Sequence, residues 1–499
     1  LGISEKMYID PALMEITLSV TQDTPLGAVT LPITVVDYHG NTQKTSATVN
    51  VVAKTEAEND FDWDEAVIYF MVTDRFADGD TSNNNNAGAG TFNKSDPGLY
   101  HGGDFAGVKA HLKDLKELGV NTIWITPIVE NIPKVQVDDG KGDIPNYASY
   151  HGYWASDFSE INGALGTKQE FQELIKAVHD EGMKLMVDVV VNHAGYGAEE
   201  SETFSGMLRK AAIEDDAFHG GGGQAGLPDF MTEYPEIRDM IIGWQLEWAN
   251  MGVDYFRVDT VKHVDSTTWM AFKNALAKAN SDFKMIGEYF DAGYATNNGG
   301  TLGSGQMDSL LDFQFNDWAA SFVRGGITGV EAELEARNAA LNNTYMTGQF
   351  LSSHDENGFK YNLKNAGASS MSDTAADAAA LVAATLQITA KGQPVIYYGE
   401  EIGLTGANDY PRQSNRYDYD WTKANDSNGT YVHYKKMLEI RKNYSAVFAR
   451  GDRKVVMASN DSGYDVISRS YDNTTLYVGM NIRDVEQTLE IPVKSSGIT

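Results

Sequence analysis

The chain has 499 residues, of which 42% are hydrophobic and 11% aromatic, so it can build a large packed core and is not intrinsically disordered. Its formal net charge of −31 argues against nucleic acid and anionic membranes as partners, because phosphate binding requires clustered cations. The chain has no cysteine, which excludes disulfides, thiolate metal sites and cysteine nucleophiles, and no apolar run reaches the roughly 18 residues of a membrane span.

Residues 1–58 differ in composition from the rest of the chain. The runs MEITLSV, AVTLPITVVD and TSATVNVVA alternate apolar residues with threonine and serine, which predicts a few antiparallel strands. A complete immunoglobulin-like sandwich needs about seven strands and 100 residues, so we expect a partial β-sandwich-like segment followed by a linker. The chain opens without a basic and apolar leader, and we expect a mature or excised fragment.

Between residues 59 and 445, apolar strand runs alternate with amphipathic helices. We predict strands at VIYFMV, TIWITPI, KLMVDVVV, VDYFRV, KMIGE, MDSLLDF, GQFLSS and PVIYYG. We predict about eight helices, among them residues 105–119, 168–182, 236–250, 267–279, 377–392 and 432–443. This alternation favours an α/β fold with a closed parallel (β/α)₈ TIM barrel. A doubly wound open sheet is the alternative, but no glycine-rich dinucleotide turn follows the first strand.

The C-terminal segment returns to a pattern of strands. Residues 446–499 contain VVMASN, YDVISRS, TTLYVGMNI and EQTLEIPV, separated by polar turns. Alternating apolar and polar residues of this kind predict antiparallel strands. We therefore expect a C-terminal all-β domain, itself incomplete.

Three predicted barrel strands end on acidic residues: Asp259, Glu288, and Asp355 next to His354. The loops after the strands carry the active site of such a barrel. Two carboxylates about 5 Å apart can hydrolyse a glycosidic bond with retention, one as nucleophile and one as acid/base. Arg257 lies on the same side of its strand as Asp259 and can pair with it, whereas the apolar run before Glu288 can raise the pKa of Glu288. We therefore assign Asp259 as nucleophile, Glu288 as general acid/base and Asp355 as the group that stabilises the oxocarbenium ion.

Four short motifs at these strand ends resemble those of the α-amylase family, glycoside hydrolase family 13. They are DVVVNH at 188–193, FRVDTVKH at 256–263, IGEY around Glu288 and FLSSHDEN at 350–357, with LPDF at 227–230 similar to a fifth. The resemblance covers about residues 62–499 and includes the C-terminal β-domain. It also implies a small inserted domain after the third barrel strand, at about 193–232.

The resemblance implies a set of sugar-binding residues. They are His151, Tyr153, Trp154, His193, Arg257, Lys262, His263 and His354. Tyr153 matches an aromatic residue that stacks on the sugar, and the pair of Lys262 and His263 is more usual in endo-acting α-1,4 enzymes. Each assignment has a structural alternative: an acid after a strand can cap a helix, and a lone histidine or YHGYW can belong to the core. For Asp188, inside its apolar run, and for the GEE at 399–401, we expect structural roles.

The resemblance also implies one or two calcium ions, which bind six to eight oxygen ligands. The ligands of one site would be Asn192, Asp229 and the carbonyl of His263, although the segment between His193 and Asp229 is short and puts one further ligand in doubt. The other site would be formed by Asp78, Asp80, Asn83, Asn84, Gly102 and Asp104. Its alternative is a solvated polar loop, because asparagine and aspartate are ordinary turn residues.

These observations predict a retaining, endo-acting α-1,4-glucan hydrolase. The expected enzyme is an extracellular α-amylase whose partner is an α-glucan such as starch or maltodextrin. The nearest alternative is a neopullulanase, cyclomaltodextrinase or glucanotransferase with the same catalytic groups. A non-catalytic glucan-binding barrel is the remote alternative, and such a protein typically lacks one of the carboxylates, whereas this chain keeps all three. The sequence makes no prediction of the oligomeric state.

Overall fold

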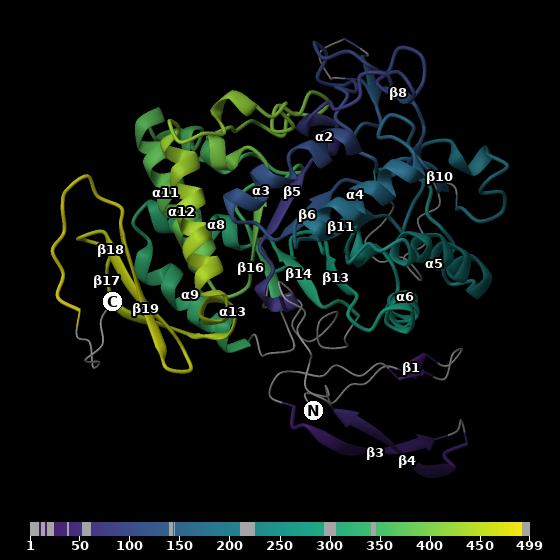
Figure 1. Cartoon of the computed structure of the whole chain (residues 1–499), viewed down its shortest axis with the longest axis horizontal. Helices are drawn as coiled ribbons and strands as arrows, with labels where there is room; N and C mark the ends of the chain where they lie inside the picture. Colours follow the sequence, from purple (N-terminus) through teal and green to yellow (C-terminus); the bar gives the residue numbers. More distant parts are fainter. Residues whose placement is uncertain are drawn as a thin grey trace.

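Eight parallel strands form a closed barrel at the centre of the molecule (Figure 1). The structure is a computed structural model that describes residues 9–10, 15–16, 24–36, 39–51, 61–138, 143, 145–209, 225–293, 306–340 and 346–491. The barrel strands are β5 (Ile68–Met71), β6 (Thr122–Ile125), β11 (Lys184–Val189), β12 (Tyr255–Val258), β13 (Lys284–Gly287), β14 (Ser309–Asp312), β15 (Met346–Phe350) and β16 (Gln393–Tyr397). The last strand pairs in parallel with the first, which closes the sheet. The predicted (β/α)₈ barrel is confirmed, and the open-sheet alternative is rejected.

The barrel strands are buried on both faces, which explains their nearly continuous apolar sequences. One face packs in the barrel interior and the other packs under the helices. In the interior, Phe70 and Trp124 stack with ring centroids 3.8 Å apart, and Phe70 meets His354 edge-on at 4.9 Å. These aromatic rings pack in the barrel interior, below the side chains at the ends of the strands.

Helices surround the barrel, as Figure 1 shows. They include α2 (Phe105–Ala110), α3 (Leu112–Leu118), α4 (Lys168–Asp180), α5 (Pro235–Asn250), α6 (Ser266–Ala279), α8 (Phe315–Val323), α9 (Ile327–Ala340), α11 (Asp373–Thr389) and α12 (Gly429–Asn443). The single helix predicted at 105–119 is two helices, because His111 leaves helical geometry and stacks on Trp421 at 3.4 Å. Over the described ranges, no helix is long and apolar enough to cross a bilayer.

Two long connections extend the barrel on the side of its active-site loops. The connection after β6 contains β7 (Val129–Asn131), β8 (Lys134–Gln136), β9 (Asn146–Ala148) and β10 (Ala155–Ile161), which form two small antiparallel sheets. The connection after β11 contains the short 3₁₀ helix η2 (Ala198–Glu200). Residues 210–224 of the expected insertion at 193–232 lie outside the described residues.

The two ends of the chain form separate β elements. β3 (Gly27–Val36) and β4 (Thr42–Val51) pair as an antiparallel hairpin that lies apart from the barrel in Figure 1, and β1 (Ile9–Asp10) pairs with β2 (Glu15–Ile16). Most of the predicted MEITLSV strand lies outside the described residues.

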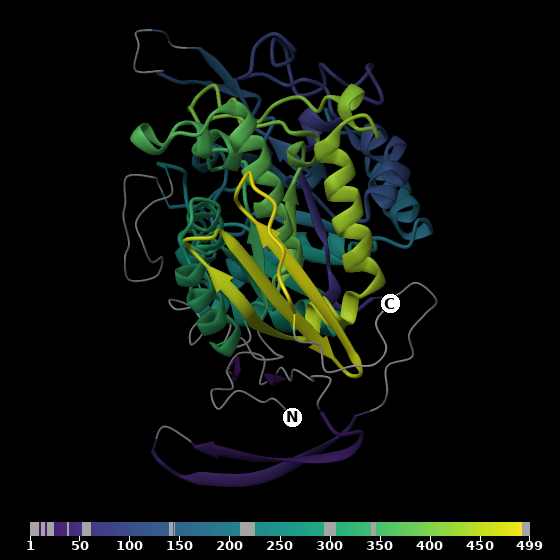
Figure 2. The ribbon, with the colours of Figure 1, turned by 90° about the vertical axis from the view of Figure 1, so that its left-hand side faces the viewer.

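The C-terminal sheet comprises β17 (Asp452–Ser459), β18 (Tyr464–Tyr471) and β19 (Thr474–Asn481), and Figure 2 shows it in yellow in front of the helices. A fourth strand was predicted at EQTLEIPV, but residues 486–491 form no strand. There the side chain of Gln487, rather than a backbone ladder, bonds to the carbonyl of Ser462. The remaining residues of that run lie beyond the described part of the chain.

Candidate active site

One buried arginine holds three carboxylates at the C-terminal ends of the barrel strands. Arg257 lies in β12 and is 1% exposed. Its Nη1 is 2.6 Å from Asp259 Oδ1 and 2.9 Å from Asp188 Oδ1, and its Nη2 is 3.1 Å from Glu288 Oε1. Val258 and Gly287 are paired in the parallel ladder, so Asp259 and Glu288 follow directly at the same edge of the sheet. The structure therefore brings the two residues predicted to be catalytic to a shared guanidinium.

The surroundings of Glu288 favour its protonated form. Burial raises the pKa of Glu288 to about 8, against the opposing effect of Arg257. The backbone N–H of Thr260 donates to Glu288 Oε2 at 3.0 Å, and Thr260 has a left-handed backbone with φ of 53°. A β-branched residue rarely adopts this conformation, so the turn after β12 is strained where it meets Glu288. At neutral pH Glu288 holds a proton that it can donate.

Asp188 is fully buried and accepts hydrogen bonds from several side chains. Tyr153 Oη donates to Asp188 Oδ2 at 2.7 Å, and Trp124 Nε1 donates to the same oxygen at 3.2 Å. Burial raises the pKa of Asp188 to about 7. Through these contacts Asp188 links Arg257 to the ring of Tyr153.

The third carboxylate, Asp355, lies at the rim and its side chain is 35% exposed. Burial raises the pKa of Asp355, but the neighbouring His354 and Arg416 side chains lower it by more, so the pKa of Asp355 is below its ordinary value. Asp355 Oδ1 is 3.0 Å from Arg416 Nη2, and Asp355 Oδ2 is 3.0 Å from His354 Nε2. Burial lowers the pKa of His354 to about 3, so its ring is neutral and donates through Nε2. Asp355 therefore stays ionised and oriented.

Several buried polar atoms around these carboxylates lack a hydrogen-bond partner among the residues that the structure describes. They are Nε2 of His193, Nδ1 of His354 and Nε of Arg257. A buried polar atom without a partner costs roughly 1–3 kcal/mol, and such groups commonly mark a binding site. Hydroxyl groups, which both donate and accept, would satisfy these donors and acceptors. The site is therefore suited to a polyhydroxylated ligand.

The aromatic segment YHGYW contributes one side of the site. Tyr153 stacks on His354 at 5.4 Å and on His151 at 5.7 Å, so its ring packs against both histidines. Trp154 is buried, meets His151 edge-on at 4.5 Å, and its backbone N–H donates to Asn131 Oδ1 at 2.7 Å. The structure thus places Tyr153 against Asp188 and His354, whereas Trp154 packs on His151 and Tyr196.

Lys262 and His263 belong to the short 3₁₀ helix η3 (Val261–His263), which follows Asp259 after one intervening residue. His263 is buried, and the Lys262 ammonium lies 5.5 Å from the ring centre of Phe290, which is partly exposed. Phe290 follows Glu288 by two residues. The pair therefore lies beside the strand ends that carry Asp259 and Glu288.

Sequence reasoning missed one group at the site, Arg416. It lies in the connection after β16, where it binds Asp355 directly and donates through Nε to the carbonyl of His354 at 2.9 Å. The available signal was its place in a long loop at the C-terminal end of the last barrel strand, because such loops build the active site.

The loop after β5 offers oxygen atoms that fit a calcium ion. Asp78 Oδ1, Asn83 Oδ1 and Asn84 Oδ1 are buried and have no hydrogen-bond partner among the described residues. A Cβ at Gly102 would lie 2.4 Å from Asn84 Oδ1 and 2.9 Å from Asp78 Oδ2, so these oxygens crowd a backbone that only glycine allows. Hard oxygen donors of this kind suit calcium.

Two other predicted ligands of this loop are already engaged. Asp104 caps α2 and accepts hydrogen bonds from Gly107 N, Gly79 N, Asp80 N and Asn83 Nδ2 at 2.7 to 3.0 Å. Asp80 accepts from Ser82 N at 2.9 Å. A calcium ion bound by Asp104 would compete with these four hydrogen bonds, so in this structure Asp104 orders the loop.

Two of the other proposed calcium ligands, Asn192 and Asp229, meet across the connection after β11. Asn192 Nδ2 lies 3.0 Å from Asp229 Oδ1, and a β-bridge joins His193 to Asp229. Burial raises the pKa of Asp229 to about 6. The structure thus brings Asn192 and Asp229 together, and part of the intervening segment lies outside the described residues.

Comparison with known proteins places this barrel and its strand-end motifs among known enzyme sequences and structures. The model of the α-amylase catalytic domain matches residues 70–220 and 201–452. The periplasmic α-amylase of Escherichia coli strain K12 is 26% identical over 85% of this chain and 73% of that protein, and neopullulanase 2 of Thermoactinomyces vulgaris is 27% identical over 87% and 72%. A crystal structure of the Geobacillus thermoleovorans α-amylase complexed with acarbose superposes with a TM-score of 0.70 at 27% identity, covering 85% of this chain and 88% of that chain. Since the family model spans more than half of the residues, the chain belongs to the α-amylase family of enzymes, glycoside hydrolase family 13.

Proposed function

We propose that this enzyme is an α-amylase, a retaining hydrolase that cleaves internal α-1,4 bonds of starch or maltodextrins. The observation that carries the proposal is the contrast between two carboxylates on one guanidinium. Asp259 lies 2.6 Å from Arg257, while burial holds a proton on Glu288 at neutral pH. Retaining glycoside hydrolysis requires this division between a nucleophile and an acid.

The reaction proceeds by double displacement. Asp259 attacks the anomeric carbon while Glu288 donates its proton to the departing glycosidic oxygen. Glu288 then takes a proton from water, which attacks the glycosyl–enzyme ester and releases Asp259. The ionised Asp355 stabilises positive charge on the sugar ring in both transition states.

The same geometry supports the proposed sugar-binding roles. The unpaired nitrogens of His193 and His354 would bond to sugar hydroxyls, and the face of Tyr153 would stack on the ring. Lys262 and His263, beside Glu288, would contact the leaving-group side. These assignments support binding of an α-glucan at the strand ends.

Calcium and an extracellular location belong to the same proposal. The loop of Asp78, Asn83, Asn84 and Gly102 would hold one ion through the unpaired oxygens, and Asn192, Asp229 and the His263 carbonyl would hold a second. An ion in the first loop would replace the contact of Lys94 Nζ with Asp78 Oδ2 at 2.9 Å. The polymeric substrate supports action outside the cell.

A second candidate is a neopullulanase-type hydrolase or a glucanotransferase with the same catalytic groups. The specific observation in its favour is that the similarity to neopullulanase 2 is as large as that to the periplasmic α-amylase. The two functions differ in the bonds cleaved and in the acceptor, not in the catalytic carboxylates.

A product profile tests the proposal. The purified chain is incubated with soluble starch, pullulan and a cyclodextrin, with and without a calcium chelator. We expect linear maltooligosaccharides from starch, released first as the α-anomer, and little product from pullulan. Panose or cyclic products would support the second candidate, and release of the β-anomer would contradict the retaining mechanism.

A further inference from the structure

The segment that carries Asp355 is held by the loop that follows β16, residues 399–416, here called the β16 loop. Residues 351–358, between β15 and α10 (Phe359–Lys364), form neither helix nor strand. The side-chain Nδ2 of Asn415 lies within hydrogen-bond distance of three carbonyls of this segment, those of Ser353 at 3.2 Å, His354 at 3.0 Å and Glu356 at 2.8 Å, which share its two hydrogens. One side chain thus binds the backbone on both sides of Asp355.

The orientation of the Asn415 amide is fixed by its surroundings. Carbonyl oxygens only accept hydrogen bonds, so the NH₂ group and not the oxygen of Asn415 must face the three carbonyls. Asn415 is 0% exposed. Its backbone N–H donates to Ala407 O at 2.9 Å, and its carbonyl accepts from Tyr397 Oη at 2.9 Å. The position of the amide is therefore set by β16 and by the loop itself.

Other contacts join the β16 loop to the same segment. Asn408 Nδ2 donates to the carbonyl of Asp355 at 2.5 Å, and the backbone N–H of Asn408 donates to Asn357 Oδ1 at 2.7 Å. Gly358 N donates to Gly406 O at 2.8 Å. The backbone of Asp355 is thus bonded directly by Asn408 and flanked by the contacts of Asn415.

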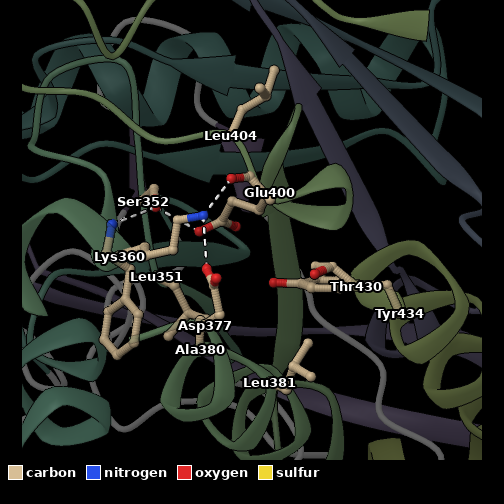
Figure 3. Close-up of a pocket in the computed structure, with 12 residues that line it drawn as sticks. Leu351, Ser352, Lys360, Asp377, Ala380, Leu381, Glu400, Leu404, Thr430 and Tyr434 are labelled. Carbon is tan, nitrogen blue, oxygen red and sulfur yellow. Dashed lines mark hydrogen bonds and ion pairs between the residues drawn. The ribbon is translucent and has the colours of Figure 1, made fainter. Parts of the chain in front are cut away.

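The beginning of the segment is anchored to the start of the β16 loop. Figure 3 shows Ser352 and Glu400 pointing toward each other, with the Ser352 hydroxyl donating to the Glu400 carboxyl. Ser352 Oγ in turn accepts from Phe359 N at 2.9 Å. Lys360 binds Gly403 O at 2.6 Å and Asp377 at 3.0 Å. Both ends of the segment are therefore tied to one loop.

We propose that Asn415 is a positioning residue, which orients the Asp355 carboxylate by fixing the backbone on both sides of it. The segment has no helix or strand ladder of its own, so its path depends on these side-chain contacts. The inference rests on the proposed glycosidase function and adds a residue that touches neither the substrate nor the reacting atoms. A misplacement of about 1 Å in a catalytic group can lower a rate about 100-fold.

The experiment compares Asn415→Ala with Asn428→Ala. Asn428, from the connection to α12, is the control, because its Nδ2 also bridges two carbonyls, those of Ile402 at 3.1 Å and Lys423 at 3.0 Å. Ile402 belongs to the β16 loop, but both carbonyls lie outside the Asp355 segment. We expect Asn415→Ala to lower kcat about 100-fold with a much smaller change in KM, and Asn428→Ala to lower thermal stability with kcat unchanged. An equal loss of kcat in both variants would overturn the proposal.

A double-mutant cycle separates positioning from general destabilisation. If Asn415 acts through Asp355, Asn415→Ala lowers kcat no further in the Asp355→Asn background. The same factor in both backgrounds would refute the proposal. Should Asn415→Ala fail to fold, Asn415→Leu keeps the volume of the side chain and removes its hydrogen-bond donors, and unchanged kcat in that variant would refute the proposal.

The wild-type chain is assayed first with the substrate panel used for the product profile. Whichever α-glucoside it cleaves fastest serves for all variants. An error in the proposed bond specificity would then appear as a different wild-type product and leave the comparison of variants intact.

Discussion

The protonation of Glu288 predicts an alkaline limit to activity. With a pKa of about 8 for Glu288, the ratio of its protonated to its ionised form is about ten to one at pH 7 and about one to ten at pH 9, since one pH unit changes this ratio by a factor of ten. The acid form is the active one, so kcat/KM falls as the pH rises through 8. We expect kcat/KM at pH 9 to be roughly one tenth of its value at pH 7, because this parameter reports the free enzyme.

The variant Glu288→Gln removes the proton that is transferred. We expect kcat on starch to fall by a factor of about 10² to 10⁴ while the fold persists, as judged by circular dichroism. On a glycosyl fluoride, whose leaving group departs without a proton, the same variant should release a burst of fluoride and accumulate the ester on Asp259. Asp259→Asn, the matched control, should release none.

The assay is initial-rate hydrolysis of a soluble maltooligosaccharide between pH 5 and 10, with recovery checked after return to pH 7. The residual activity of Glu288→Gln should lack the limb near pH 8. A wild-type limb that survives in Glu288→Gln, or comparable turnover in that variant, would refute the assignment of Glu288 as the acid.

Three further predictions concern stability. Asp465 is buried, and burial together with Glu331 raises its pKa from the ordinary 3.8 to about 8. Between pH 4 and 8 the protein therefore takes up a proton when it folds, and the folded state becomes less stable as the pH rises. Asp465→Asn should therefore stabilise the protein by roughly 2 to 4 kcal/mol at pH 7 and by little near pH 4, measured by urea unfolding. Tyr153→Phe removes a donor from buried Asp188 and should cost about 1–3 kcal/mol in the same assay. A calcium chelator should lower the Tm of the wild type by more than that of Asp78→Ala, which keeps only the second proposed site, since an ion that binds only the folded state stabilises it; equal shifts in both would contradict a site at Asp78.

The barrel could be predicted because its strands are buried on both faces. Runs such as IYFM and TIWI are apolar throughout, and each is followed by a polar loop. The strands β7 to β9 have only three residues each, too few for alternation to be visible, and they were missed. The helices α8 and α9 were not singled out, and α9 buries the charged residues Glu331 and Arg337 beside its apolar positions, which weakens the apolar pattern in its sequence.

At the candidate site, residues next to a strand could be predicted from the sequence, whereas residues in a distant loop could not. Asp259 and Glu288 could be located because each directly follows a buried strand. Arg416 and Asn415 could not, because they lie in an aperiodic loop, and the segment that they hold lies about sixty residues earlier in the chain. Only the parallel pairing of β15 with β16 brings that loop beside Asp355.

Charge balance at Arg257 favours protonation among the three carboxylates that contact it. Asp188, Asp259 and Glu288 all contact a single guanidinium, whose charge can compensate one carboxylate. Ionising all three would leave two uncompensated negative charges in a buried site, which costs several kcal/mol per ion. Burial raises the pKa values of Glu288 and Asp188 to about 8 and about 7, and the neighbouring Asp259 carboxylate adds to both increases, whereas Arg257 opposes them. The proton on the acid of the proposed reaction is thus a consequence of burying several carboxylates together, while Arg257 holds Glu288 in position and lowers its pKa.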